Sequence, residues 1–317
     1  MDATANSPNK RAKCSGGEAA ATDEKVNVYV WDMDETLILF KSLLDGTYAK
    51  AHDGMKDAQR GAEIGEMWEN LILDLCDQHF FYDQVEDHNE PSLGSLSKFD
   101  DGCDLAKYSF EQDEFTSSVD DDKKRRLAYR YRTISSMYDK GLCDLFPKEK
   151  KEKWDELYEL TDEYTDRWLS SARSFLQQCV SEKEDPDPRV DSSVETLGTC
   201  HVNVLVTSGA LVPSIAKCML YRFDSLIKHG DVYSALDVGK LQCFEWVRER
   251  FSGPNFRFCV IGDGWEECAA AKSMGWPFVQ VNFQQGTCHK FPGLTLRTLG
   301  HYFSVVYDEH RPADEEA

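Results

Sequence analysis

Short, continuous runs of apolar residues are the feature that most restricts how this chain can fold. Runs rich in β-branched and aromatic residues occupy 26–31, 202–206, 258–261 and 278–281. Such runs, without alternating polar residues, are typical of strands buried on both faces of a parallel sheet. Segments of helical period alternate with them at 211–221, 240–251 and 265–274. The alternation predicts a doubly wound α/β fold.

The stretch between the first two predicted strands has a different character. Apolar residues recur there at helical spacing in three groups, at 64–75, 127–138 and 154–168. An acidic segment over 83–122 separates the first two groups and is predicted to be a loop. We therefore expect a helical cap insert at 41–199 within an α/β core formed by 25–40 and 200–308. The ends are predicted to be a disordered tail at 1–24 and an acidic tail at 309–317.

Composition restricts the partners and the location that we expect. The 317-residue chain has a formal net charge of −21, which argues against direct binding to nucleic acid or to an anionic membrane surface. It has no apolar stretch long enough to span a bilayer and no apolar signal core near its start, so a cytoplasmic or nuclear location is expected. A basic run at 123–126, continued by Arg130 and Arg132, is interpreted as a solvated helix face that pairs with the acidic segment before it.

The eleven cysteines follow no pairing pattern and are expected to be reduced. None of them has an arginine six positions later. The cysteine-and-arginine loop of ordinary tyrosine phosphatases is therefore missing from this chain.

Polar residues follow the predicted strands at the points where they end. The carboxyl ends of parallel strands meet at one edge of a sheet, so we expect these side chains to lie close together. Two carboxylates that are two residues apart in extended chain point to the same side, and their repulsion is costly unless a cation or proton is shared. The candidates at these ends are Asp32, Asp34, Thr36, Thr207, Ser208 and Asp263, with Lys240 opening a helix.

A hard divalent cation would resolve the repulsion between these carboxylates. The side chains of Asp32 and Asp263 and the backbone carbonyl of Asp34 can supply oxygen ligands, and water and a substrate phosphate would complete the octahedron of Mg²⁺. Asp32 would attack phosphorus and form an acyl phosphate, while Asp34 would protonate the leaving oxygen and then activate water. Lys240 and the hydroxyl of Thr207 would bind phosphoryl oxygens.

Each of these residues also has a purely structural interpretation. An acidic strand end is commonly a solvated turn, and Thr207 is a candidate cap of the following helix. Taken by itself, Lys240 would be interpreted as a surface charge, and residues 262–264 would be interpreted as a tight turn. The catalytic interpretation depends on the order of these residues along the chain. Each of them follows a predicted strand or opens a predicted helix, in the sequence that a catalytic site at one sheet edge requires.

The ordered set resembles the haloacid-dehalogenase superfamily of aspartate-nucleophile phosphotransferases. The commoner loop of that superfamily has glycine where Glu35 stands, whereas the ending 34–36 is similar to two branches, the RNA-polymerase-tail serine phosphatases and the Eyes absent proteins. The similarity to the Eyes absent domain spans roughly 26–283 and includes the helical insert, which the serine-phosphatase branch lacks. The stretches that carry it are 31–36, 42–49, 127–132, 202–207, 233–235, 239–240 and 260–267.

The resemblance implies a Mg²⁺-dependent protein tyrosine phosphatase that acts on phosphotyrosine proteins. Position by position, it implies that Asp32 is nucleophile and metal ligand, that Asp34 is acid/base and metal ligand, and that Asp263 is a metal ligand. It also implies that Glu267 supports the metal through water. The substrate-binding candidates are Thr36, Thr207, Ser208 and Lys240.

Other functions remain open from the sequence. A phosphatase of small phosphometabolites or of phosphoserine proteins would use the same core, and a largely non-catalytic interaction module would keep only the fold. The intact residue set speaks against the module. The chain shows no counterpart of the long amino-terminal activation region of animal members, and it departs from them after about residue 283. The sequence therefore does not decide whether the protein has a transcriptional role, a partner surface built after residue 283 cannot be transferred from the animal members, and the protein partners are unknown.

Overall fold

The computed structural model describes residues 25–113, 120–180, 200–284, 286 and 289–308. The predicted tails at 1–24 and 309–317 lie outside the described residues. Among the helices within these ranges, none has both the length and the apolar character needed to cross a membrane.

Five parallel strands form the central sheet in the order β3-β2-β1-β4-β5. Trp31 at the end of β1 is in register with Leu205 of β2 and Ile261 of β4, so these three strands end close to one edge of the sheet. This parallel sheet confirms the predicted haloacid-dehalogenase-like α/β class, and it adds a short strand, β3, that the sequence did not predict. The strands are β1 (Val26–Trp31), β2 (Cys200–Thr207), β3 (Val232–Ser234), β4 (Phe256–Gly262) and β5 (Phe278–Gln280).

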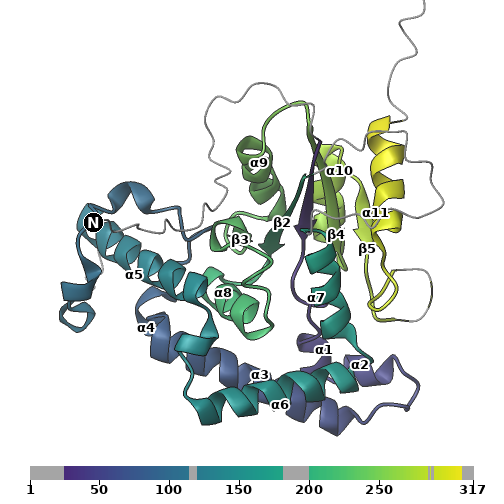
Figure 1. The fold of residues 1–317 in the computed structure, drawn as a ribbon, viewed down its shortest axis with the longest axis horizontal. Coiled ribbons are helices and arrows are strands. Elements are labelled where there is room, and N and C mark those ends of the chain that lie inside the picture. The colour runs from purple at the N-terminus through teal and green to yellow at the C-terminus, as the bar shows by residue number, and fades with distance from the viewer. Residues whose placement is uncertain (1–24, 114–119, 181–199, 285, 287–288, 309–317) are drawn as a thin grey trace, which may run out of the picture.

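Helices cover both faces of the sheet (Figure 1). Val28 and Val30 of β1 belong to the apolar cluster that includes α9 and α10. The alternate residues Tyr29 and Trp31 belong to the cluster on the other face, with α7, α8 and α11. Burial on both faces explains why the strand sequences are continuously apolar. The helices of the core are α8 (Leu211–Leu220), α9 (Lys240–Arg250), α10 (Trp265–Met274) and α11 (Leu296–Phe303).

Most of the chain between β1 and β2 forms a helical layer beyond the carboxyl-terminal edge of the sheet, in which α3 and α6 run side by side, whereas α7 at the end of this stretch packs against the sheet itself (Figure 1). One expected helix is divided here, because α6 ends before Trp168 and α7 begins at it, with Asp166 and Arg167 between them in left-handed conformation. The helices of this insert are α1 (Lys41–Leu44), α2 (Thr47–Lys50), α3 (Ala58–His79), α4 (Tyr82–Val85), α5 (Asp121–Lys140), α6 (Lys148–Tyr164) and α7 (Trp168–Gln178).

The basic face of α5 is only partly solvated, which corrects the sequence interpretation. Arg132 pairs with Asp100 of the acidic segment at 2.8 Å, as the charge pattern predicted. Arg130, in contrast, is fully buried and donates to Asp113 at 2.7 Å and to Gln84 at 2.7 Å. The ion pair of Arg130 and Asp113 therefore fastens the acidic segment to the insert.

Candidate active site

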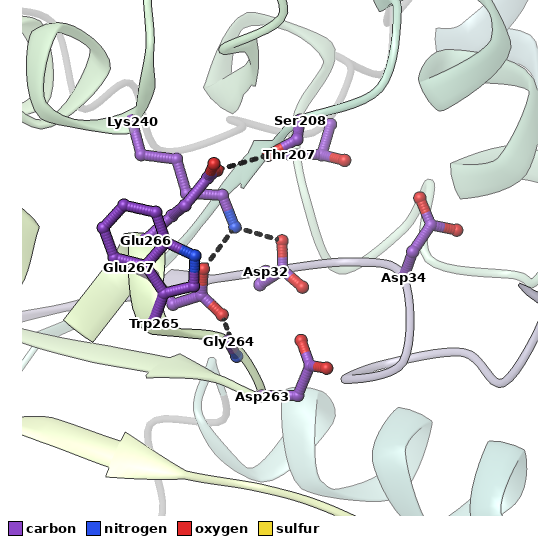
Figure 2. Close-up of a pocket in the computed structure, with 10 residues that line it drawn as sticks. All are labelled: Asp32, Asp34, Thr207, Ser208, Lys240, Asp263, Gly264, Trp265, Glu266 and Glu267. Atoms are coloured by element: carbon purple, nitrogen blue, oxygen red, sulfur yellow. Dashed lines mark hydrogen bonds and ion pairs between the residues drawn. The ribbon is translucent and has the colours of Figure 1, made fainter. Parts of the chain in front are cut away.

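A cavity of about 270 Å³ opens at the carboxyl-terminal edge of the sheet (Figure 2). It brings together seven of the eight residues that the sequence singled out as site residues. The eighth, Thr36, is fully buried and donates its hydroxyl to Asp32 Oδ2 at 3.1 Å, so it supports a lining residue instead of lining the cavity. The lining residues are Asp32, Asp34, Thr207, Ser208, Lys240, Asp263, Gly264, Trp265, Glu266 and Glu267.

Lys240 is the electrostatic centre of the cavity. As the first residue of α9 it is buried, and its Nζ donates to Asp32 Oδ1 at 2.7 Å and to Glu267 Oε2 at 2.6 Å. Burial alone would lower the pKa of Lys240, but the two carboxylates outweigh that effect and raise it. Lys240 is therefore a fixed positive charge and not the surface lysine of the structural interpretation.

The carboxylates around Lys240 outnumber it. Burial raises the pKa of Asp32 to about 7, with Lys240 opposing the shift and Glu267 adding to it. Burial also raises the pKa of Asp263 to about 6, and the charge of Glu267 adds to that shift. With all three carboxylates ionised and one ammonium beside them, the group has a formal charge of −2, which one divalent cation would cancel.

The same three acidic side chains could hold such a cation. Asp32, Asp263 and Glu267 each offer a carboxylate oxygen, and these atoms lie within 4.8 Å of one another. A set of carboxylate oxygens suits a hard ion such as Mg²⁺ or Ca²⁺. The chemistry of the donors and the net charge of the group therefore both fit a divalent metal.

Asp34 lines the same cavity as Asp32, but it is not among the three acidic side chains that lie close enough together to share a cation. It lies where the chain turns after β1, with Leu37 N donating to Met33 O at 2.9 Å. Asp34 Oδ1 accepts from Lys217 Nζ at 2.6 Å, and Figure 2 shows Asp34 across the cavity from Glu267.

Sequence reasoning missed Lys217, although a signal was present. The residue lies on α8 between Ala216 and Cys218, in a helix whose other residues are mostly buried and apolar. A lone lysine in such a helix needs a partner, because an unpaired buried charge is costly. Its ammonium forms an ion pair with Asp34 and also lies 4.8 Å from the ring centre of Phe40.

Thr207 and Ser208 line the cavity from the end of β2 and the turn after it. Thr207 is buried, and its Oγ1 accepts from Gly209 N at 3.2 Å within the turn, so it does not cap α8, whose N-cap residue is Ala210. The exposed Ser208 donates to Glu266 Oε2 at 3.3 Å.

Glu267 also helps to form the turn that carries Asp263. Its Oε1 accepts from Gly264 N and caps the start of α10. A Cβ atom at Gly262 would lie only 2.6 Å from the side chain of Glu267, so this position requires glycine. The glycines of this segment thus allow the close approach of Glu267 as well as forming a turn.

No family model matches the chain, whereas several known proteins are similar to it along most of its length. The protein phosphatase EYA of Arabidopsis thaliana is 55% identical over 293 residues, which cover 92% of this chain and 94% of that protein. The protein phosphatase EYA2 of Homo sapiens is 33% identical over 94% of this chain and 53% of its own length. The protein phosphatase eya of Drosophila melanogaster is 31% identical over 87% of this chain and 36% of its own. The chain thus matches nearly the whole plant relative but about half or less of these animal relatives.

Proposed function

Because the chain belongs to the Eyes absent family of protein phosphatases, we propose that it hydrolyses phosphotyrosine in proteins, with Asp32 as nucleophile and Mg²⁺ as cofactor. The observation that carries the proposal is the placement of Asp32. Its carboxylate lines the cavity, held by Lys240 on one oxygen and by Thr36 on the other, and belongs to the group of three acidic residues. A nucleophile fixed in this way loses little entropy when the substrate arrives.

The proposed reaction proceeds in two displacements at phosphorus. An oxygen of Asp32 forms a bond to phosphorus as the bond to the tyrosine oxygen breaks, which leaves an aspartyl phosphate. Water then attacks that phosphorus, releases inorganic phosphate and regenerates the Asp32 carboxylate. Asp34, on the opposite side of the cavity from Glu267, would give a proton to the leaving phenolate and take one from the attacking water.

Charge must be offset for a phosphate dianion to enter this acidic cavity. Lys240, with Thr207 and Ser208 beside the cavity, would bind phosphoryl oxygens. Asp32, Asp263 and Glu267 would hold Mg²⁺, which when bound would neutralise the excess carboxylate charge and polarise the phosphoryl group. Lys240 and Glu267 form a salt bridge of 2.6 Å, so a change of either residue would alter the position of the other.

The identity of the substrate is the most specific part of the proposal. Attack at phosphorus does not itself distinguish phosphotyrosine from phosphoserine or a phosphometabolite, so selectivity has to come from the entrance and from the better leaving ability of phenolate. The family relationship supports a protein substrate, and the intact set of polar lining residues supports catalysis over a purely binding role. We also propose that the protein acts in the cytoplasm or nucleus on phosphotyrosine proteins and does not bind nucleic acid directly.

Matched peptides that differ only at the phosphorylated residue test the proposal. With Mg²⁺ we expect phosphotyrosine to exceed phosphoserine by about tenfold in kcat/KM, equivalent to about 1.4 kcal/mol. Activity should vanish in EDTA and return with Mg²⁺, and Asp32→Asn should be inactive while remaining folded. Full turnover in EDTA would refute the metal, and an active Asp32→Asn variant would refute the nucleophile. Faster hydrolysis of a sugar phosphate than of either peptide would identify a metabolite phosphatase instead.

A further inference from the structure

Trp265 is an exposed tryptophan whose position packing does not explain. It is 77% exposed, the highest value among the exposed large hydrophobic side chains of the described residues. Tryptophan side chains are usually well buried, because exposure of so large an apolar surface is costly. Trp265 opens α10, yet the buried residues of that helix are Glu267, Ala270 and Ala271. The aromatic pairs found among the described residues do not include Trp265 either.

The indole of Trp265 stands at the active-site cavity. It follows Asp263 and Gly264 directly, and Figure 2 shows it on the same side of the cavity as Lys240 and Glu267. The other nine lining residues are charged, hydroxyl-bearing or glycine. Among the described residues, Trp265 is therefore the one large apolar side chain that lines this cavity. The polar residues suit a phosphoryl group, and Trp265 suits the apolar group that carries it.

We propose that Trp265 determines the preference for aryl phosphates, by stacking on the phenyl ring of phosphotyrosine while the phosphoryl group lies against Asp32. The inference rests on the proposed function and deepens it, because it assigns the substrate class to one side chain. Aromatic rings attract each other in stacked or edge-to-face arrangements beyond the effect of area burial. A serine phosphate has no ring to offer and gains nothing from the indole.

Other exposed apolar residues at this edge provide a control. Leu236 and Val238 lie on the segment between β3 and α9, and Leu241 lies in the first turn of α9. They are exposed at 54%, 40% and 42%, but they do not line the cavity. A peptide that merely adheres to apolar surface near the site would depend on them as much as on Trp265.

The test compares Trp265→Ala, Trp265→Phe and the control Leu236→Ala on the matched phosphotyrosine and phosphoserine peptides with Mg²⁺. We expect Trp265→Ala to lose about three- to tenfold in kcat/KM for phosphotyrosine and less than about twofold for phosphoserine. Trp265→Phe should stay within about twofold of the wild type on both peptides, because it keeps a ring. Leu236→Ala should leave the ratio of the two rates unchanged.

Binding gives a second measurement. A non-hydrolysable phosphonate analogue of the phosphotyrosine peptide should quench the tryptophan fluorescence of the wild type, and the Trp265→Phe variant should lose that component. An unchanged phosphotyrosine preference in Trp265→Ala, or equal losses on both peptides, would overturn the assignment of Trp265 while the proposed function stands. A wild type that hydrolyses neither peptide would overturn the proposed function and this inference with it.

Discussion

Replacing Asp32 with asparagine should make the metal-free protein more resistant to unfolding at pH 8, although the same change should abolish turnover. Asp32 is 6% exposed, and burial raises its pKa from 3.8 to about 7 despite the opposing charge of Lys240. Between these two values the folded protein keeps a proton that the unfolded chain has released. The stability that this group contributes is therefore fully present below about pH 4 and is lost as the pH rises through 7.

The magnitude follows from the size of the shift. One pKa unit corresponds to about 1.4 kcal/mol, so a rise of roughly three units predicts a loss of up to about 4 kcal/mol above pH 8. Asparagine has nearly the same shape and cannot ionise, so the variant avoids this loss, although its carbonyl oxygen can replace only one of the two carboxylate oxygens that accept from Thr36 and Lys240. In the variant Lys240 keeps its bond to Glu267 but loses the carboxylate of Asp32, which reduces the gain, and we expect a net advantage of about 2–4 kcal/mol.

Urea unfolding in EDTA at pH 5 and pH 8, followed by circular dichroism, measures this difference. The advantage of Asp32→Asn at pH 5 should be less than half of its value at pH 8. Mg²⁺ at about 1,000 times its Kd should then remove or reverse the difference at pH 8, because a ligand at that concentration adds about 4.1 kcal/mol to the protein that binds it. A variant less stable than the wild type in EDTA at pH 8, or a difference independent of pH, would refute the electrostatic reasoning.

Three further predictions concern other parts of the molecule. Lys217→Met removes the positive charge that holds Asp34, and we expect about a tenfold loss of kcat on phenyl phosphate. The loss should be smaller on p-nitrophenyl phosphate, whose leaving group needs less protonation, and equal losses on the two substrates would contradict a role of Lys217 through Asp34. Arg130→Met leaves Asp113 without its buried partner and should cost about 3–5 kcal/mol in urea unfolding, whereas a cost below about 1 kcal/mol would show that the pair is dispensable. Alkylation of the accessible thiols should leave turnover nearly unchanged, because no described cysteine lines the cavity, and inactivation that substrate prevents would contradict this.

Much of the core could be predicted because its elements are long enough to show their period. The apolar runs of β1, β2 and β4 and the helices α8 to α10 agree with the expected positions to within a few residues. β3 and β5 both have three residues, but the run 278–281 around β5 contains three apolar residues and was predicted, whereas β3 has only Val232 and Tyr233 before a serine and was missed. Trp168 continues the helical spacing of the apolar residues of α6, so the sequence predicted one helix. The left-handed residues Asp166 and Arg167 end that helix and redirect the chain, and the spacing of apolar residues does not reveal such a break.

The cavity could be predicted only where its residues follow strand ends. Asp32, Thr207 and Asp263 gather there because parallel strands bring their carboxyl ends to one edge. The pair of Asp34 and Lys217 joins residues 183 positions apart, and it depends on the packing of α8 against the turn after β1. No local pattern contains that information, so sequence reasoning missed Lys217 as the partner of Asp34.

Glu35 shows how the insert and the proposed catalytic turn are joined. Its φ of 62° is a left-handed conformation that favours glycine, the residue at this position in the commoner loop of the superfamily. The carboxylate offsets that strain, since Oε1 accepts from Phe40 N at 3.0 Å and from Ser42 N at 3.1 Å, where the insert begins. At the other end of the insert, Trp168 Nε1 donates to Thr36 O at 3.1 Å. The turn is therefore held at both ends of the insert, and a shift of the insert would move Asp34 relative to Asp32.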